Sequence, residues 1–142
     1  MTVPVRTEDP PVAAQYVKRW LPYSEVFVHR LVSALRRFRP VVFAQALVDP
    51  GRFPVPDLRV LDLRRGTWAW VLQQAGRAAG RDRIRERALR GDGARLVHAH
   101  FGPAAVEILR AARRCRIPLV TSFYGFDLCV LAADPRWREA YR

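Results

Sequence analysis

The stretch LVHAHFGPAAVEILRAARRCRIPLVTSFYGFD, residues 96–127, decides the fold class of this chain. It combines two short apolar runs, residues 94–100 and 117–123, with a segment of helical spacing between them that opens at Pro103. Proline suits the first turn of a helix, and the arginines near the end of the segment suit its negative pole. A strand, a helix and a strand joined by short links indicate a β–α–β unit with parallel strands.

The rest of the chain repeats this alternation. Further strands are predicted over residues 13–20, 41–47 and 58–63, and helices over residues 24–38 and 67–90. Ser24 would cap the first helix and Pro40 would stop it. Glycines weaken the second helical region, so that one helix or two fit its pattern. We therefore predict an α/β, Rossmann-like parallel sheet of about five strands with helices on both faces.

The length of 142 residues suits one domain. Residues 1–12, with three prolines and no periodicity, are predicted to be an extended or disordered lead-in, and residues 13–142 to form the domain. The sequence ends without a glycine cap or a polar tail, which indicates an interrupted domain.

The charge is strongly basic, at +12, and Lys18 is the one lysine among 25 cationic residues. Such an excess indicates a nucleic acid, an anionic lipid surface or a phosphorylated ligand as a partner, whereas a GC-rich coding bias would produce the same composition. Nucleic-acid binders usually cluster cations on one face or interleave them with exposed aromatic residues. Here the aromatic residues fall in strands and on apolar helix faces, so no specific nucleic acid is expected, and a basic nucleic-acid-binding module remains the alternative.

Several sequence signals for secretion, membrane insertion and cofactor binding are missing, and their absence limits the expected location and chemistry of the protein. The start has no apolar core of a signal peptide, and the apolar stretch PVVFAQALV is far shorter than the ~18–20 residues of a membrane span. Cys115 and Cys129 have no metal spacing and are predicted to be buried, reduced thiols. The expected location is the cytoplasm, or the inner face of the membrane. Without a P-loop, a nucleotide-binding glycine fingerprint or a metal-ligand spacing, no cofactor and no metal are predicted.

The first candidate binding loop follows the strand that ends at His100. In a doubly wound sheet, ligands bind beyond the carboxyl ends of the strands. Gly102 would let a ligand approach the N-terminus of the next helix, where free N–H groups favour anions, and His100 would hydrogen-bond it or move a proton. His98 lies two residues earlier, on the same side of the strand, and is expected to pack there. His29, in the middle of a helix, is expected to be exposed to solvent.

The second candidate loop, Tyr124-Gly125-Phe126-Asp127, lies at the same edge after the last strand. Tyr124 offers a hydroxyl group and an aromatic face, and Gly125 a tight turn. Asp127 offers a carboxylate for a sugar hydroxyl group or for an arginine, and an equally good reading is that it caps the following helix. Together the two loops predict a ligand site built by His100, Gly102 and these residues.

Residues 96–127 resemble the N-terminal domain of family four glycosyltransferases, especially those of bacterial exopolysaccharide and lipopolysaccharide synthesis. The shared pattern is strand–HAHFG–helix–IPLV–strand–(H/Y)GxD, and WLPYSEVFVHRLVSALRRFRPVVFA, residues 20–44, is similar to the opening loop and first helix of that domain. The resemblance implies the GT-B arrangement of two Rossmann-like domains and metal-independent transfer of a hexose, with retention, from a nucleotide-sugar to a lipid-linked or polysaccharide acceptor. It makes His100 and Tyr124 candidate catalytic residues, and Gly102, Gly125 and Asp127 candidates for binding the sugar or acceptor.

The resemblance covers the acceptor side only. The nucleotide-sugar would bind a C-terminal donor domain that these residues do not supply, so the isolated chain is expected to be inactive, and an inactive remnant is a further alternative. Tyr124 stands where the family often has a histidine, and tyrosine cannot take the proton role of histidine near neutral pH. Exposed Arg30, Arg36 and Arg37 would suit peripheral contact with an anionic membrane.

Overall fold

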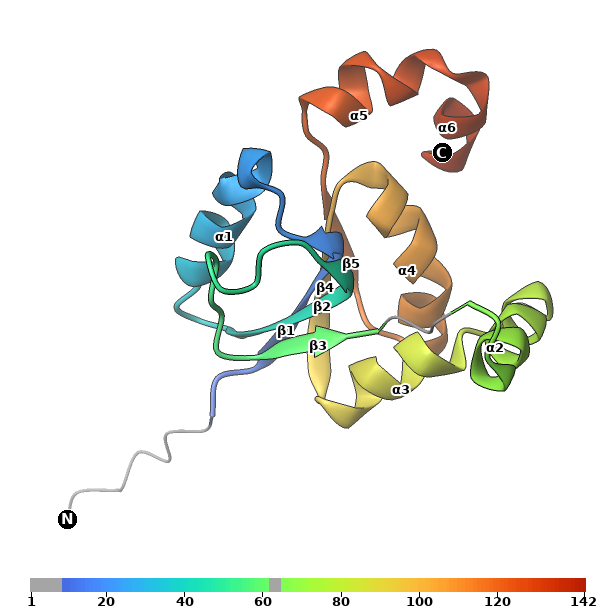
Figure 1. Cartoon of the computed structure of the whole chain (residues 1–142), viewed down its shortest axis with the longest axis horizontal. Coiled ribbons are helices and arrows are strands. Elements are labelled where there is room, and N and C mark those ends of the chain that lie inside the picture. Colours follow the sequence, from blue (N-terminus) through green and yellow to red (C-terminus); the bar gives the residue numbers. More distant parts are fainter. Residues whose placement is uncertain (1–8, 62–64) are drawn as a thin grey trace.

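The computed structural model describes residues 9–61 and 65–142 and contains a five-stranded, entirely parallel sheet in the order β3-β2-β1-β4-β5 (Figure 1). This confirms the predicted α/β class. The strands are β1 (Val12–Trp20), β2 (Arg39–Leu47), β3 (Leu58–Val60), β4 (Ala94–His100) and β5 (Leu119–Ser122).

Helices cover both faces of this sheet. Helix α1 lies on one face, and α3 and α4 lie on the other, with α2 beyond α3 (Figure 1). A last segment, α5 to α6, continues from the carboxyl end of β5. The bounds are η1 (Tyr23–Glu25), α1 (Val26–Ser33), α2 (Trp68–Ala78), α3 (Arg83–Gly91), α4 (Gly102–Cys115), α5 (Gly125–Cys129), η2 (Leu131–Ala133) and α6 (Pro135–Ala140).

Strand β1 organises two separate cores because its side chains alternate between the two faces of the sheet. Val12, Ala14 and Tyr16 are buried against the face that α3 and α4 cover, whereas Val17 and Trp20 are buried against the α1 face. Strand β2 is apolar on both sides at its centre, with Val41 and Phe43 in one core and Val42 and Ala44 in the other, which explains its continuous apolar run in the sequence.

The first α-helix is shorter than predicted. It ends at Ser33 instead of extending to residue 38, and Ser24 lies in the 3₁₀ turn η1 without capping α1. The Arg36 guanidinium donates to the Ser33 carbonyl at 3.3 Å, which helps to close the helix early. The chain must then reverse, because β2 begins at Arg39. Pro40 lies inside that strand beside Ala13 and does not terminate the helix.

Other boundaries differ by a few residues. The predicted helical region 67–90 is two helices, since Gly80 adopts a positive φ of 74° between them. Strand β1 starts one residue earlier than predicted, at Val12, while residues 1–8 lie outside the described part of the chain. The predicted strand 58–63 is strand over Leu58–Val60, and residues 62–64 lie outside the described part. Of the helices in the described ranges, none has the length and apolarity needed to cross a membrane.

A buried polar cluster ties β1 and β2 to α3 and α4. The Arg85 Nε atom donates to the Tyr16 hydroxyl at 2.7 Å, and its guanidinium also contacts Asp82 and Glu107. Gln45 donates to the same hydroxyl at 2.9 Å. Burial raises the pKa of Tyr16 to about 12, against the opposing effect of the Arg85 charge. These groups compensate one another, as buried charges must.

Strand order reverses beside β1. Helix α1 leads from β1 to β2 on one side, and the later chain returns to place β4 on the other side. The carboxyl ends of β1 and β4 therefore border the point at which connections diverge, where doubly wound sheets hold their ligands.

Candidate functional site

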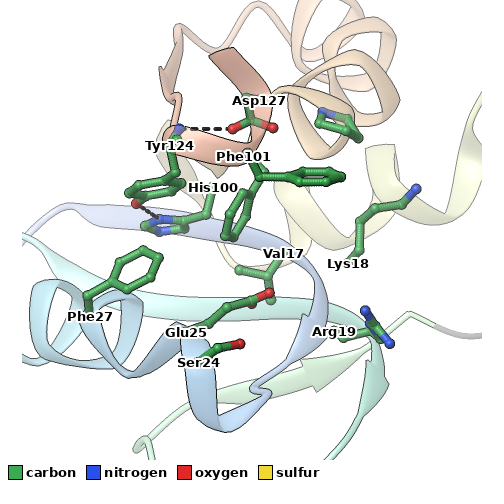
Figure 2. Close-up of a pocket in the computed structure, with 13 residues that line it drawn as sticks. Val17, Lys18, Arg19, Ser24, Glu25, Phe27, His100, Phe101, Tyr124 and Asp127 are labelled. Atoms are coloured by element: carbon green, nitrogen blue, oxygen red, sulfur yellow. Dashed lines mark hydrogen bonds between the residues drawn. The ribbon is translucent and has the colours of Figure 1, made fainter. Parts of the chain in front are cut away.

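A cavity of about 490 Å³ lies at this reversal point (Figure 2). Strand β1 contributes Lys18 and Arg19 from its carboxyl end, and the segment that follows contributes Glu25 and Phe27. The ends of β4 and β5 contribute the other wall, formed by His100, Phe101, Tyr124, Gly125 and Asp127. The two loops predicted from the sequence therefore meet at one site.

His100 forms the floor of this site, with both of its ring nitrogens bound. Its side chain is fully buried, Nε2 lies 3.0 Å from Oε1 of Gln15, and Nδ1 lies 2.9 Å from the Tyr124 hydroxyl. An amide oxygen can only accept, so Nε2 carries the proton and Nδ1 accepts from Tyr124. The predicted catalytic residue thus holds the neutral tautomer that orients Tyr124.

The surroundings favour this neutral form. Burial, with a smaller contribution from the neighbouring His98, lowers the pKa of His100 to about 3. If His100 were protonated, Nδ1 would carry a hydrogen and could no longer accept the hydrogen bond from the Tyr124 hydroxyl. In this arrangement His100 is a positioning group, and the hydroxyl of Tyr124 is the polar atom it places at the cavity wall.

His98 packs on the strand, as predicted. Its ring lies 4.3 Å from that of His100, which places both on one side of β4, and its Nε2 atom lies 2.8 Å from the Ser122 hydroxyl. Burial also raises the pKa of Tyr124, and hydrogen bonding from Ser122 opposes that rise. A run of polar contacts consequently joins β4 to the end of β5 beneath the cavity.

Aromatic rings form the wall above His100. The Tyr124 ring lies 4.7 Å from that of Phe27 and 4.6 Å from that of Phe101. Phe101 adopts a positive φ of 75°, which is rare for a residue with a β-carbon and costs about 1–3 kcal/mol. This strained turn carries the chain from β4 into α4 and leaves the Phe101 ring in the cavity wall, as Figure 2 shows.

Asp127 performs the capping role that the sequence left open. Its Oδ2 atom accepts from the Tyr124 backbone N–H at 2.9 Å, which fixes the start of α5. The side chain is completely buried, yet its Oδ1 atom has no hydrogen-bond partner among the described residues. One carboxylate oxygen of this cavity-lining residue is thus buried without a donor.

Gly102 is buried at the start of α4, under Tyr141. A β-carbon at this position would lie 2.3 Å from the Tyr141 hydroxyl oxygen. The close approach that we predicted for a ligand is therefore made by a side chain of the same molecule. Gly125, by contrast, lines the cavity directly.

Charged groups occupy the side of the cavity opposite the aromatic wall (Figure 2). Lys18 lies 2.9 Å from Glu107 of α4. Burial raises the pKa of Glu25, while the charge of Arg19 acts in the opposite direction. The cavity can thus offer cations to an anionic group and carboxylates to hydroxyl groups, next to apolar ring faces.

Sequence reasoning missed part of this site. Lys18, Arg19 and Glu25 line the cavity but were not among the predicted site residues. The available signal was their position, because charged residues that interrupt an apolar strand at its carboxyl end fall at the ligand edge of a parallel sheet. Gln15 lies within the strand and gave no such signal.

Two further expectations are wrong. His29 is half-buried, with its ring 5.6 Å from Phe53 and its Nε2 atom 3.0 Å from the Pro54 carbonyl oxygen. Cys129 is exposed, whereas Cys115 is partly buried, and both are free thiols. Cys129 is exposed because it lies on α5 two residues after Asp127, which faces the interior. Residues two apart on a helix point in nearly opposite directions.

The sequence was compared with known protein families and with curated proteins. No protein-family model matches this chain, and no curated protein matches its sequence.

Proposed function

We propose that this chain is the acceptor-binding part of a glycosyltransferase that moves a hexose from a nucleotide-sugar to a lipid-linked or polysaccharide acceptor. In this proposal a separate domain or subunit holds the nucleotide-sugar, and the present chain alone has no transfer activity. The resemblance of residues 96–127 motivates the reaction class, and the geometry of the cavity supports a saccharide or phosphate-bearing ligand.

One observation carries the proposal. The cavity at the reversal point combines the ring faces of Phe27, Phe101 and Tyr124 with polar groups on its other side. Sugar rings present C–H groups on their faces and hydroxyl groups around their edges. Aromatic ring faces beside carboxylates are complementary to that distribution, and the few placed polar groups would fix the orientation.

In this scheme the acceptor sugar packs on the aromatic wall. The carboxylate of Glu25 accepts from its hydroxyl groups, and Arg19 neutralises a phosphate on a lipid-linked acceptor. The Oδ1 atom of Asp127, buried without a partner among the described residues, accepts a further hydroxyl group once the side chain turns toward the cavity. His100 holds Tyr124 in place from below, through the 2.9 Å hydrogen bond.

Binding of simple probes tests the proposal. We would titrate the chain with methyl hexopyranosides and with farnesyl phosphate and follow the backbone amides by NMR. Phe27 is 39% exposed, so Phe27→Ala should fold normally and weaken binding about tenfold, equivalent to about 1.4 kcal/mol. Leu72→Ala, at an exposed position on α2, is the matched control.

Four outcomes separate the candidates. Saturable shifts around the cavity that weaken in Phe27→Ala support an acceptor site. Saturable binding that Phe27→Ala leaves unchanged would place the ligand elsewhere and overturn the proposal, as would no saturable binding. Tighter binding of an oligonucleotide, with sequence preference, would instead favour a nucleic-acid-binding module.

A further inference from the structure

A second cavity, of about 230 Å³, lies on the other face of the sheet. Gln45, near the end of β2, lines it and donates to Tyr16, whereas His100 of the first site contacts Gln15. Successive residues of a strand point to opposite faces, so β1 separates the two cavities. Helices α2 and α3 close the second cavity with Gln73, Arg77 and Arg85 among its lining residues.

The lining of this cavity is rich in hydrogen-bond donors. Within the described ranges it comprises arginine and glutamine side chains with two apolar neighbours and no carboxylate; the residues are Gln45, Leu61, Arg65, Trp70, Gln73, Gln74, Arg77 and Arg85. Guanidinium groups bind phosphate through parallel N–H donors, and amide groups add further donors. The donors of Arg85 and Gln45 are engaged with Tyr16, Asp82 and Glu107, so the donors that match an oxyanion are those of Arg65, Arg77 and Gln74.

The carboxylates nearest to this cavity already have cationic partners. Arg85 pairs with both Asp82 and Glu107, and Glu107 also pairs with Lys18 at 2.9 Å. Arg77 lies 3.8 Å from Asp82, at the outer limit of an ion pair. Two carboxylates thus face three cations, and the positive charge of Arg77 is only weakly compensated.

An adjoining cavity of about 220 Å³ brings further positive charge close to Arg77. It shares Arg77 with the cavity of about 230 Å³ and is also lined by Arg81, Arg110, Asp82 and Glu107. The Arg110 guanidinium donates to the Arg77 carbonyl at 3.4 Å, which holds α4 beside the end of α2. An anion beside Arg77 would therefore have the guanidinium groups of Arg81 and Arg110 nearby, while Asp82 and Glu107 are engaged by Arg85.

Gln73, one of the residues that line the cavity, has a buried oxygen atom without a hydrogen-bond donor among the described residues. The Gln73 Nε2 group points to Asp82 at 3.5 Å, whereas its Oε1 atom is buried and has no partner in the described part of the chain. A buried acceptor without a donor is unfavourable by about 1–3 kcal/mol. Gln73 lines the cavity, so a side-chain rotation would bring this oxygen to a ligand hydroxyl group, and that hydrogen bond would remove the deficit.

We propose that this cavity binds a small phosphorylated metabolite that carries a free hydroxyl group. The guanidinium of Arg77 holds the phosphate, and Oε1 of Gln73 accepts from the hydroxyl. The volume is below the roughly 300–1,000 Å³ of pockets for drug-sized ligands, so the ligand is smaller than a nucleotide-sugar. This site is independent of the acceptor cavity and of its proposed function.

The probes are glycerol 3-phosphate and inorganic phosphate, measured by calorimetry at about 0.15 M NaCl, where charges more than roughly 8 Å apart are screened. Arg77→Gln should weaken glycerol 3-phosphate binding about tenfold. Arg37→Gln removes the same charge from an exposed position after α1 and should change binding less than about twofold. Both positions are on the surface, and circular dichroism would verify that each variant folds.

A second variant tests the hydroxyl contact. The wild-type chain should prefer glycerol 3-phosphate to inorganic phosphate, and Gln73→Leu should abolish that preference while retaining phosphate binding. Equal weakening by Arg77→Gln and Arg37→Gln would show binding to the basic surface in general and overturn the site. A preference that survives in Gln73→Leu would overturn the hydroxyl assignment, and no saturable binding of either probe would overturn the whole proposal.

Discussion

The Tyr124 hydroxyl donates to Nδ1 of His100 at 2.9 Å, and this contact joins the ends of two neighbouring strands. His100 ends β4, while Tyr124 follows β5, and Gln15 of β1 holds the opposite nitrogen of the imidazole. Three strands thereby converge on one buried ring. The resulting geometry is rigid at the floor of the cavity and leaves its rim to residues on loops.

Two tyrosine substitutions should have opposite effects on stability. Tyr124→Phe leaves Nδ1 of His100 buried without a donor, which should lower the free energy of unfolding by about 1–3 kcal/mol. Tyr141→Phe removes a buried hydroxyl that has no partner within the described residues, so it should be neutral or stabilising. Urea denaturation at pH 7 measures both, and a larger loss in Tyr141→Phe would contradict the assigned contacts.

Stability should fall as the pH drops below about 6.5. In the unfolded chain His100 takes up a proton near that pH, whereas burial keeps its pKa at about 3 in the folded chain. The unfolded state therefore binds more protons, and the free energy of unfolding should decrease by about 1.4 kcal/mol per pH unit. Burial lowers the pKa of His98 as well, which acts in the same direction.

Denaturation curves between about pH 7.5 and 5 would measure this slope. The variant His100→Gln should be less stable at neutral pH and should show a shallower slope than the wild-type chain. Equal slopes in the two proteins would mean that His100 is not the buried neutral group described above.

Gly102→Ala should release α6 from α4. The new β-carbon would lie 2.3 Å from the Tyr141 hydroxyl oxygen, so the ring must leave its place. Overpacking of this kind costs about 1–3 kcal/mol. Hydrogen exchange of residues 135–141 and the fluorescence of Trp137, whose ring lies 5.7 Å from Tyr141, would report the release.

Gly125→Ala is the control for this experiment. No described atom lies within 4 Å of a β-carbon at that position, and the glycine is helical, so alanine should be neutral or slightly stabilising. In a Tyr141→Ala background, Gly102→Ala should cost almost no further stability, because the ring it would meet is absent. An equal loss in both backgrounds would show that the clash is not the cause.

Arg85→Met should be among the most destabilising changes in the chain. It leaves Asp82 and Glu107 buried or half-buried with one cation fewer, and breaking such a cluster costs about 3–5 kcal/mol. Arg142→Met removes one partner of the exposed pair with Glu139 and should cost less than about 1 kcal/mol. Thermal unfolding would compare them, and similar shifts would show that the buried cluster is not structurally important.

The sequence predicted the fold because periodicity and turn residues act locally. The apolar runs around Val41 and Val97 and the proline at position 103 define strands and a helix without reference to distant residues. The end of α1 could not be predicted in this way. Its periodic apolar pattern continues past Ser33, but pairing of Arg39 with Val12 requires the chain to turn back earlier.

The candidate site was predictable only where strand ends mark it. His100 and Tyr124 follow apolar runs, and parallel topology brings such positions to one edge. Their mutual hydrogen bond, and the part of Gln15, depend on the register between β1 and β4, which pairs Gln15 with His98. The contact of Tyr141 with Gly102 depends on the path of the chain after β5, where no local pattern fixes the direction.

The position of β1 in the middle of the sheet has a consequence for how the protein is made. During synthesis β1 and β2 can pair as soon as residue 47 has left the ribosome, but the other edge of β1 stays open until β4 has emerged, because Val12 pairs with Ala94. The floor of the cavity lined by His100 and Tyr124 is complete only after Tyr124 has been added. Nascent chains thus carry a central strand with one unpaired edge for much of translation, and such an edge favours aggregation until β4 pairs with it.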